Sequence, residues 1–243
     1  MSDERSRLPT RSAGDAAVAV VRAIVGSVPY VGPASVELFN WFVKAPHDRR
    51  LEELIELFGE TLADLQANRG IDLRTLQNNP AFFDVLMQAI QIGLRNHQTE
   101  KREGLRNAIA NSAVAHAPSE SKRQMFLHFI DVFTVWHLKL LAFFANPQAY
   151  LTSLGKGLPQ LGYSTPVRHG IEIAFPDLQR QQDFYDQIWS DLRQRGLVIT
   201  QPPPGTVTIS SPGHRKQTTA LGDEFLNFIT TPKPDSELTR MAK

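Results

Sequence analysis

The sequence has no cysteine among its 243 residues. This excludes disulfides, thiolate catalysis and cysteine-ligated metal sites, and it suits a reducing compartment such as the cytoplasm. The sequence also lacks an excess of basic charge, because 26 Lys and Arg residues face 25 Asp and Glu residues. Proteins that bind nucleic acid usually carry such an excess, so the composition does not favour that class.

Long hydrophobic runs are missing as well. No stretch of about 18 uncharged apolar residues occurs, which argues against a standard membrane-spanning helix. A secretory signal is not indicated, because Asp3, Glu4 and Asp15 interrupt the basic N-terminal residues and Pro29 breaks the apolar stretch that follows. The apolar content of 42% is nevertheless ample for a hydrophobic core. We therefore expect a soluble cytoplasmic protein.

Apolar residues recur at spacings of three and four along most of the chain, which predicts a mainly α-helical fold. The clearest amphipathic helix covers residues 48–68. A helix predicted over residues 118–145 is apolar on more than one side, so we expect it at the centre of its domain. The predicted organisation is a disordered arm (1–14), a helical bundle (15–145), a C-terminal module (146–231) and a flexible tail (232–243).

The C-terminal module has a recognisable order of elements. A helix ends at Arg195-Gly196-Leu197-Val198, two short predicted strands follow at 197–199 and 207–209, and Thr219-Ala220-Leu221-Gly222 opens a last helix. This order resembles the back half of a winged-helix domain. The resemblance implies a recognition helix and a β-hairpin wing. We therefore expect a mainly α fold, with an N-terminal helical bundle and a C-terminal winged-helix module containing a short β-hairpin.

A winged-helix module can bind DNA or protein. If it bound DNA, the resemblance implies these nucleic-acid-binding residues: Arg193, Arg195, His214, Arg215 and Lys216. The helix over residues 177–195 departs from that role, because its four aspartates outnumber its three arginines and oppose phosphate. We therefore favour contact with a protein partner or a second copy in a homodimer, and keep a DNA-binding regulator as the alternative.

The N-terminal region shows a second, vaguer resemblance. Pro29-Tyr30-Val31-Gly32-Pro33, followed by Arg49-Arg50-Leu51-Glu52-Glu53, is similar to uncharacterised bacterial helical proteins, some of which are suspected in phage defence. The apolar segment 16–43 is expected to form a helical hairpin packed on the bundle. A membrane-active effector is the alternative, but Arg22 and Glu37 lie inside the segment and oppose insertion.

Neither a catalytic constellation nor a cofactor or metal site is visible. His128 and His137 are nine positions apart, so they do not form the i, i+4 pair that chelates metal, and we expect hydrogen-bonded core or edge histidines. Gly155-Lys156-Gly157 lacks the residue order of a phosphate-binding loop.

The acidic side chains of the helix over residues 48–68 also offer no catalytic pair. Glu52, Glu56 and Glu60 are expected to form a solvated stripe on its surface. The sequence therefore predicts a non-enzymatic regulatory or protein-interaction protein that needs no cofactor, and it does not indicate a small-molecule ligand.

Overall fold

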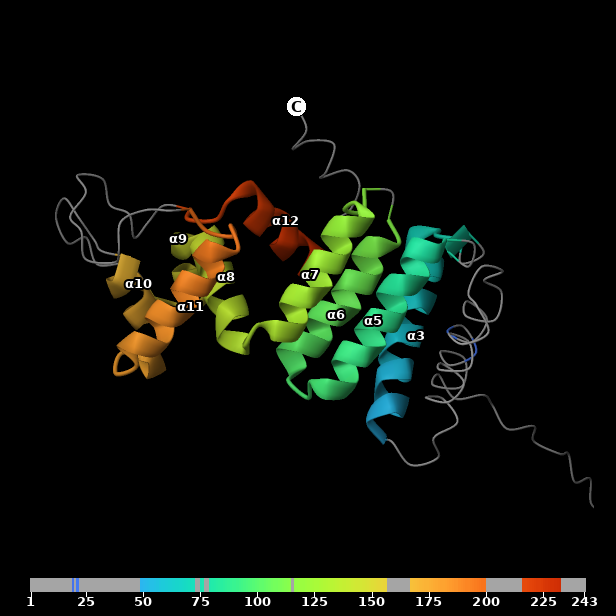
Figure 1. The fold of residues 1–243 in the computed structure, drawn as a ribbon, viewed down its shortest axis with the longest axis horizontal. Helices are drawn as coiled ribbons and strands as arrows, with labels where there is room; N and C mark the ends of the chain where they lie inside the picture. Colours follow the sequence, from blue (N-terminus) through green and yellow to red (C-terminus); the bar gives the residue numbers. More distant parts are fainter. Residues whose placement is uncertain are drawn as a thin grey trace, which may run out of the picture. The chain divides into compact units, whose positions relative to one another are not determined.

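The computed structural model describes residues 19, 21, 49–72, 75–76, 79–114, 116–156, 167–199 and 216–232, and these are mainly helical, as predicted (Figure 1). The predicted arm, nearly all of the apolar segment 16–43, and residues 233–243 of the predicted tail lie outside this described part. The chain divides into two compact units. Unit 1 comprises Met1–Asp131 with Phe228–Lys243, and unit 2 comprises Val132–Asn227.

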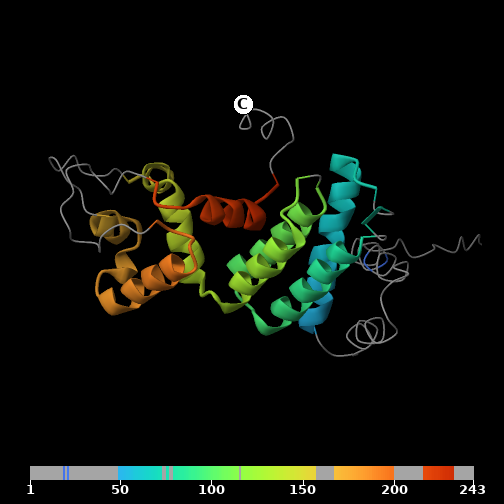
Figure 2. The same cartoon turned by 45° about the horizontal axis from the view of Figure 1, so that its top comes forward.

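Unit 1 is built from four described helices. They are α3 (Arg49–Arg69), α5 (Pro80–Arg95), α6 (Thr99–Ser112) and α7 (Glu120–Val132, to Asp131 in this unit). The helices α3, α5 and α6 contact one another and lie side by side in Figures 1 and 2. Asn79 caps α5 by accepting the Phe82 amide at 3.2 Å, as Asn-Pro at this point predicts. The core of unit 1 contains Leu54, Phe58, Leu62, Leu65, Phe82, Leu86, Ile90, Leu105, Ile109, Phe126 and Ile130.

A short C-terminal segment, residues 228–232, completes unit 1. The side chain of Asn107 donates to the carbonyl of Ile229 at 3.0 Å, and Asn111 donates to the carbonyls of Phe228 and Thr230 at 3.0 and 2.7 Å. The Phe228 ring also packs 5.5 Å from the ring of Phe126. Side chains of α6 and α7 therefore fix a segment that lies more than a hundred residues later in the sequence.

Unit 2 consists of α8 (Val135–Ala145), α9 (Pro147–Ser153), α10 (Val167–Ala174), the short 3-10 helix η1 (Pro176–Leu178), α11 (Gln182–Gln194) and α12 (Ala220–Ile229, to Asn227 in this unit). Its core is strongly aromatic. The Phe144 and Trp189 rings meet edge to face at 4.4 Å between centroids. The helix α8 contacts α11 and belongs to unit 2. The division between the units therefore falls after Asp131, whereas the predicted boundary was at 145/146.

The predicted continuous helix over residues 118–145 is wrong, because two helices, α7 and α8, cover this stretch. Thr134 lies between them with extended backbone (φ −78°, ψ 164°) and begins α8. Its amide donates to Nδ1 of His137 at 3.1 Å, and its hydroxyl lies 2.8 Å from the same nitrogen. This capping box starts a new helix and so interrupts the predicted one. The break was missed because the residues on both sides of it are apolar.

The predicted β-hairpin wing is contradicted. The described residues contain no β-strand, and Val198 forms only an isolated antiparallel bridge with Thr218. The bridge does not extend, because the Gln217 amide donates to the carbonyl of Phe144 at 2.8 Å instead of continuing a ladder. Residues 207–209, the expected second strand, lie outside the described part.

The motif Thr219-Ala220-Leu221-Gly222 has a local explanation that requires no wing. The hydroxyl of Thr219 accepts the Gly222 amide at 3.0 Å, so Thr219 caps α12 as predicted, and it donates to the carbonyl of Gly196 at 2.6 Å. A Cβ added at Gly222 would lie 2.1 Å from the carbonyl oxygen of Leu197. Glycine is therefore required where α12 crosses the turn after α11.

Not every apolar residue of α11 belongs to its buried face. The apolar side chain of Phe184 is 38% exposed. The inward face instead consists of Tyr185, Ile188, Trp189 and Leu192. Tyr185 and Trp189 extend the i, i+3, i+4 pattern set by Ile188 and Leu192, which leaves Phe184 on the outer side.

Candidate functional site

The basic residues predicted for nucleic-acid contact do not form a free cationic surface in the part that the structure describes. Lys216 is engaged by an ion pair with Asp223. Arg195 follows α11 and holds its guanidinium 5.3 Å from the Phe133 ring centre. Arg193 is half-buried on α11. The other two predicted residues, His214 and Arg215, lie outside the described residues.

The exposed side of α11 is acidic. Asp183 and Asp186 are exposed beside the partly exposed Phe184. Asp191 is half-buried and accepts a hydrogen bond from Gln187 at 2.8 Å. This acidic surface would repel phosphate. The electrostatic argument against DNA binding, made above from the sequence, therefore also applies to the folded helix.

His137 is a hydrogen-bonded core histidine, as predicted. It is 6% exposed and stacks on Phe133, with the ring planes 5° apart. Its Nε2 lies 3.3 Å from Asp191, while Nδ1 accepts from Thr134. Nδ1 is occupied by the capping contact, and His128, nine residues earlier, is exposed. Across the described ranges, no three His, Asp or Glu side chains gather as metal ligands.

Lys156, the lysine of the glycine-rich sequence, has a structural role. Its Nζ donates to the carbonyl of Ile173 in α10 at 2.9 Å, and Gly155 supplies the positive φ of 67° that ends the α9 region. A phosphate-binding role would need this ammonium free, whereas here it is bound to the backbone of α10.

Lys101 is a buried cation that the sequence reasoning missed. It is 4% exposed, and its Nζ donates to Oδ1 of Asn96 and to the carbonyl of Asp131, both at 2.9 Å. Burial lowers the pKa of this ammonium, and the nearby charge of Asp131 partly opposes that shift. The only available signal was position, since Lys101 lies one turn before the inward-facing Leu105. Its bonds tie the α5–α6 turn to the end of α7.

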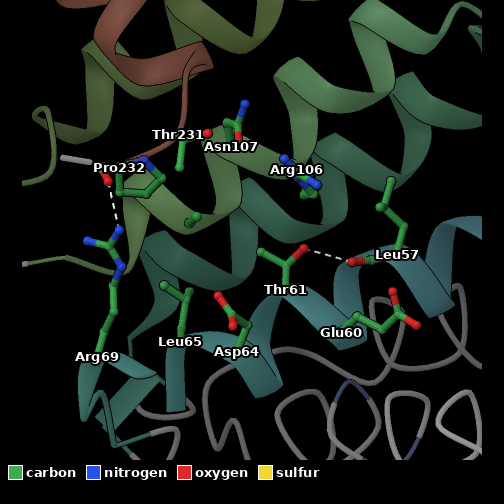
Figure 3. A pocket seen from close by; sticks show the side chains of 11 residues that line it. Leu57, Glu60, Thr61, Asp64, Leu65, Arg69, Arg106, Asn107, Thr231 and Pro232 are labelled. Carbon is green, nitrogen blue, oxygen red and sulfur yellow. Dashed lines mark hydrogen bonds between the residues drawn. The ribbon is translucent and has the colours of Figure 1, made fainter. Parts of the chain in front are cut away.

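A hollowed surface of unit 1 runs between α3 and α6. Two adjoining hollows, of about 270 and 390 Å³, share Leu57, Glu60 and Arg106, and we call them together the α3–α6 groove. Figure 3 shows the first hollow, with Asp64 on the α3 side and Arg106 on the α6 side. Thr231 and Pro232 close one end. The charged lining comprises Glu53, Glu56, Glu60, Asp64 and Glu103, with Arg69, Arg102 and Arg106.

Only some of these charges are engaged. Arg102 pairs with Glu53 at 3.1 Å, and Arg69 donates to the carbonyl of Pro232 at 2.7 Å, as Figure 3 shows. Glu60 and Arg106 form no hydrogen bond or ion pair in the described part of the chain. The groove therefore presents unused charge of both signs, with carboxylates in the majority.

The sequence predicted the acidic residues of this surface but not the groove. Glu56 and Glu60 were read as a solvated stripe, and they are indeed exposed. The sequence did not reveal that α6 and residues 231–232 lie beside this stripe and form the other walls of the groove. Those walls are distant in sequence, and no local periodicity links them to α3.

Among the described helices, none is long and apolar enough to cross a membrane. Comparison of the chain with models of known protein families, with curated proteins and with solved structures gave no match. The geometry of the α3–α6 groove is therefore the basis for a functional conclusion.

Proposed function

We propose that this chain is a non-enzymatic protein-interaction protein, and that the α3–α6 groove receives a segment of a partner protein. The single observation that carries the proposal is the groove itself, whose lining combines apolar Leu57, Leu65 and Ala110 with charged side chains. A lining that is partly apolar and partly charged suits a polypeptide, which supplies both kinds of group.

The form of the groove supports a chain more than a compact small molecule. The two hollows extend from Thr99 at the start of α6 to Pro232, so the surface follows the length of two helices. Elongated grooves between helices are a recurring means of holding peptides. The absence of cysteine suits a reducing compartment, and we place the interaction in the cytoplasm.

Photocrosslinking tests this proposal in cells that express the full chain. A photoreactive phenylalanine at Thr99, which is exposed and lines the groove, should give a discrete adduct with another protein. The same group at Gln91, exposed on α5 outside the groove, is the matched control and should give none. Glu56→Lys with Glu60→Lys should remove the Thr99 adduct.

Three results would contradict the proposal. Equal adducts from the Thr99 and Gln91 positions would show non-specific contact. An adduct that survives both charge reversals would show that the groove does not hold the partner. An adduct containing two copies of this chain would show that the groove mediates self-association and not contact with a partner protein.

A further inference from the structure

The carboxylates of α3 follow the groove with a regular repeat. Glu53, Glu56, Glu60 and Asp64 are three or four residues apart and all line it. Because an α-helix rises about 1.5 Å per residue, successive carboxylates are displaced by roughly 4.5 to 6 Å along the helix axis. Alternate residues of an extended chain, which lie on one face, are roughly 6.4 to 6.8 Å apart. The four-residue step from Glu56 to Glu60, about 6 Å, comes close to this repeat.

The central members of this row are available to a ligand. Glu53 is held by Arg102, and Asp64 accepts a hydrogen bond from Asn68. Glu56 and Glu60, between them, have no hydrogen-bond or ion-pair partner among the described residues. Two unpaired carboxylates at the repeat of an extended peptide complement two cationic side chains at alternate positions.

Arg106 indicates that the ligand must also carry a hydrogen-bond acceptor. It lines both hollows, and within the described ranges it has neither an ion-pair nor a hydrogen-bond partner. A guanidinium needs acceptors. An extended polypeptide offers a backbone carbonyl at every residue, whereas a free polyamine offers cations but no acceptor. Nucleic acid offers acceptors, but its phosphates would face Glu56 and Glu60.

We infer that the groove binds an extended protein segment carrying Lys or Arg at alternate positions. Two of its cations pair with Glu56 and Glu60, and a backbone carbonyl accepts from Arg106. This inference rests on the proposed function and adds the chemistry and spacing of the partner segment to it.

Fluorescence anisotropy with the full chain and two labelled peptides tests the inference. One peptide alternates Lys and Ser (KSKSKS), and the other has the same composition in blocks (KKKSSS). The alternating peptide should bind at least about fivefold more tightly in moderate salt, because only it presents all its lysines on one face. Glu56→Gln and Glu60→Gln should each weaken it about two- to fivefold, the range for exposed ion pairs.

Two controls separate the groove from general charge attraction. Glu52→Gln removes an exposed carboxylate of α3 that does not line the groove, and it should leave the affinity unchanged. Arg106→Gln should weaken the peptide but not spermine, which has no acceptor. Equal binding of the two peptides, equal loss on Glu52→Gln, or spermine displacing the alternating peptide at comparable concentration would each overturn the inference.

The failures of the two proposals are distinguishable. If the groove-specific adduct at Thr99 persists while the alternating peptide shows no preference, the spacing is wrong and the interaction role stands. If the Thr99 position gives no adduct and neither peptide binds, both proposals are overturned.

Discussion

Gly222 is the position where a single methyl group should have the largest effect on unit 2. In Gly222→Ala the new Cβ would lie 2.1 Å from the carbonyl oxygen of Leu197, so the backbones must separate by about 1.3 Å to reach an ordinary 3.4 Å contact. That shift strains the hydrogen bond from the Thr219 amide to Leu197, now 3.0 Å long, and the bond from its hydroxyl to Gly196.

The expected cost follows from these opposing effects. Overpacking costs about 1–3 kcal/mol, each weakened hydrogen bond adds about 1 kcal/mol, and the helix preference of alanine returns about 1 kcal/mol. We therefore expect Gly222→Ala to lower the free energy of unfolding by about 2–4 kcal/mol. Urea unfolding measures this loss. It is followed by tryptophan fluorescence, to which Trp136 and Trp189 of unit 2 contribute.

Gly104 provides the matched control, because it is also a glycine inside a helix. A Cβ there would meet the side chain of Ile229 at 3.8 Å, an ordinary contact. Gly104→Ala should therefore raise the free energy of unfolding by about 0.4–1 kcal/mol. Urea unfolding followed by circular dichroism measures this gain. A Gly222→Ala variant as stable as the unmodified chain would refute the close approach of α12 to Leu197.

Three further substitutions test other parts of the structure. Asn107→Ala removes the buried donor to Ile229 and should destabilise unit 1 by about 1–3 kcal/mol in urea unfolding. Tyr185→Phe removes a buried hydroxyl with no hydrogen-bond partner among the described residues, so thermal unfolding should show unchanged or higher stability, by up to about 1 kcal/mol. Lys101→Met tests the lowered pKa of Lys101. Between that pKa and the ordinary value of 10.5 the unfolded chain binds more protons, so the unmodified protein should gain stability relative to the variant as pH rises through this window. A pH-independent difference between the two would show that Lys101 titrates normally.

Local features of the fold were predictable from the sequence. Asn79 and Thr219 cap the helices that follow them, and Gly196, with φ of 71°, ends the α11 region. Each of these features depends on a side chain or glycine within a few residues of the helix end, so the signal lies in one short stretch.

Features set by distant contacts were not predictable in the same way. The wing was wrong because, among the described residues, Val198 forms only an isolated bridge with Thr218, and the Gln217 amide donates to the carbonyl of Phe144, more than seventy residues earlier. Burial of Lys101 depends on the carbonyl of Asp131, thirty residues later, as one of its two acceptors. Of the candidate site, the sequence supplied the carboxylates of α3, but the opposing wall depends on how α6 packs.

The late segment that completes unit 1 has a consequence for synthesis on the ribosome. All of unit 2, Val132–Asn227, is translated before the carbonyls of Phe228 and Ile229 exist for Asn111 and Asn107 to bind. Nascent α3, α5, α6 and α7 must therefore wait for their final hydrogen-bond acceptors while the intervening residues emerge. Because the entropic cost of closing a loop grows only logarithmically with its length, this order of emergence delays the last step of unit 1 without making it prohibitive.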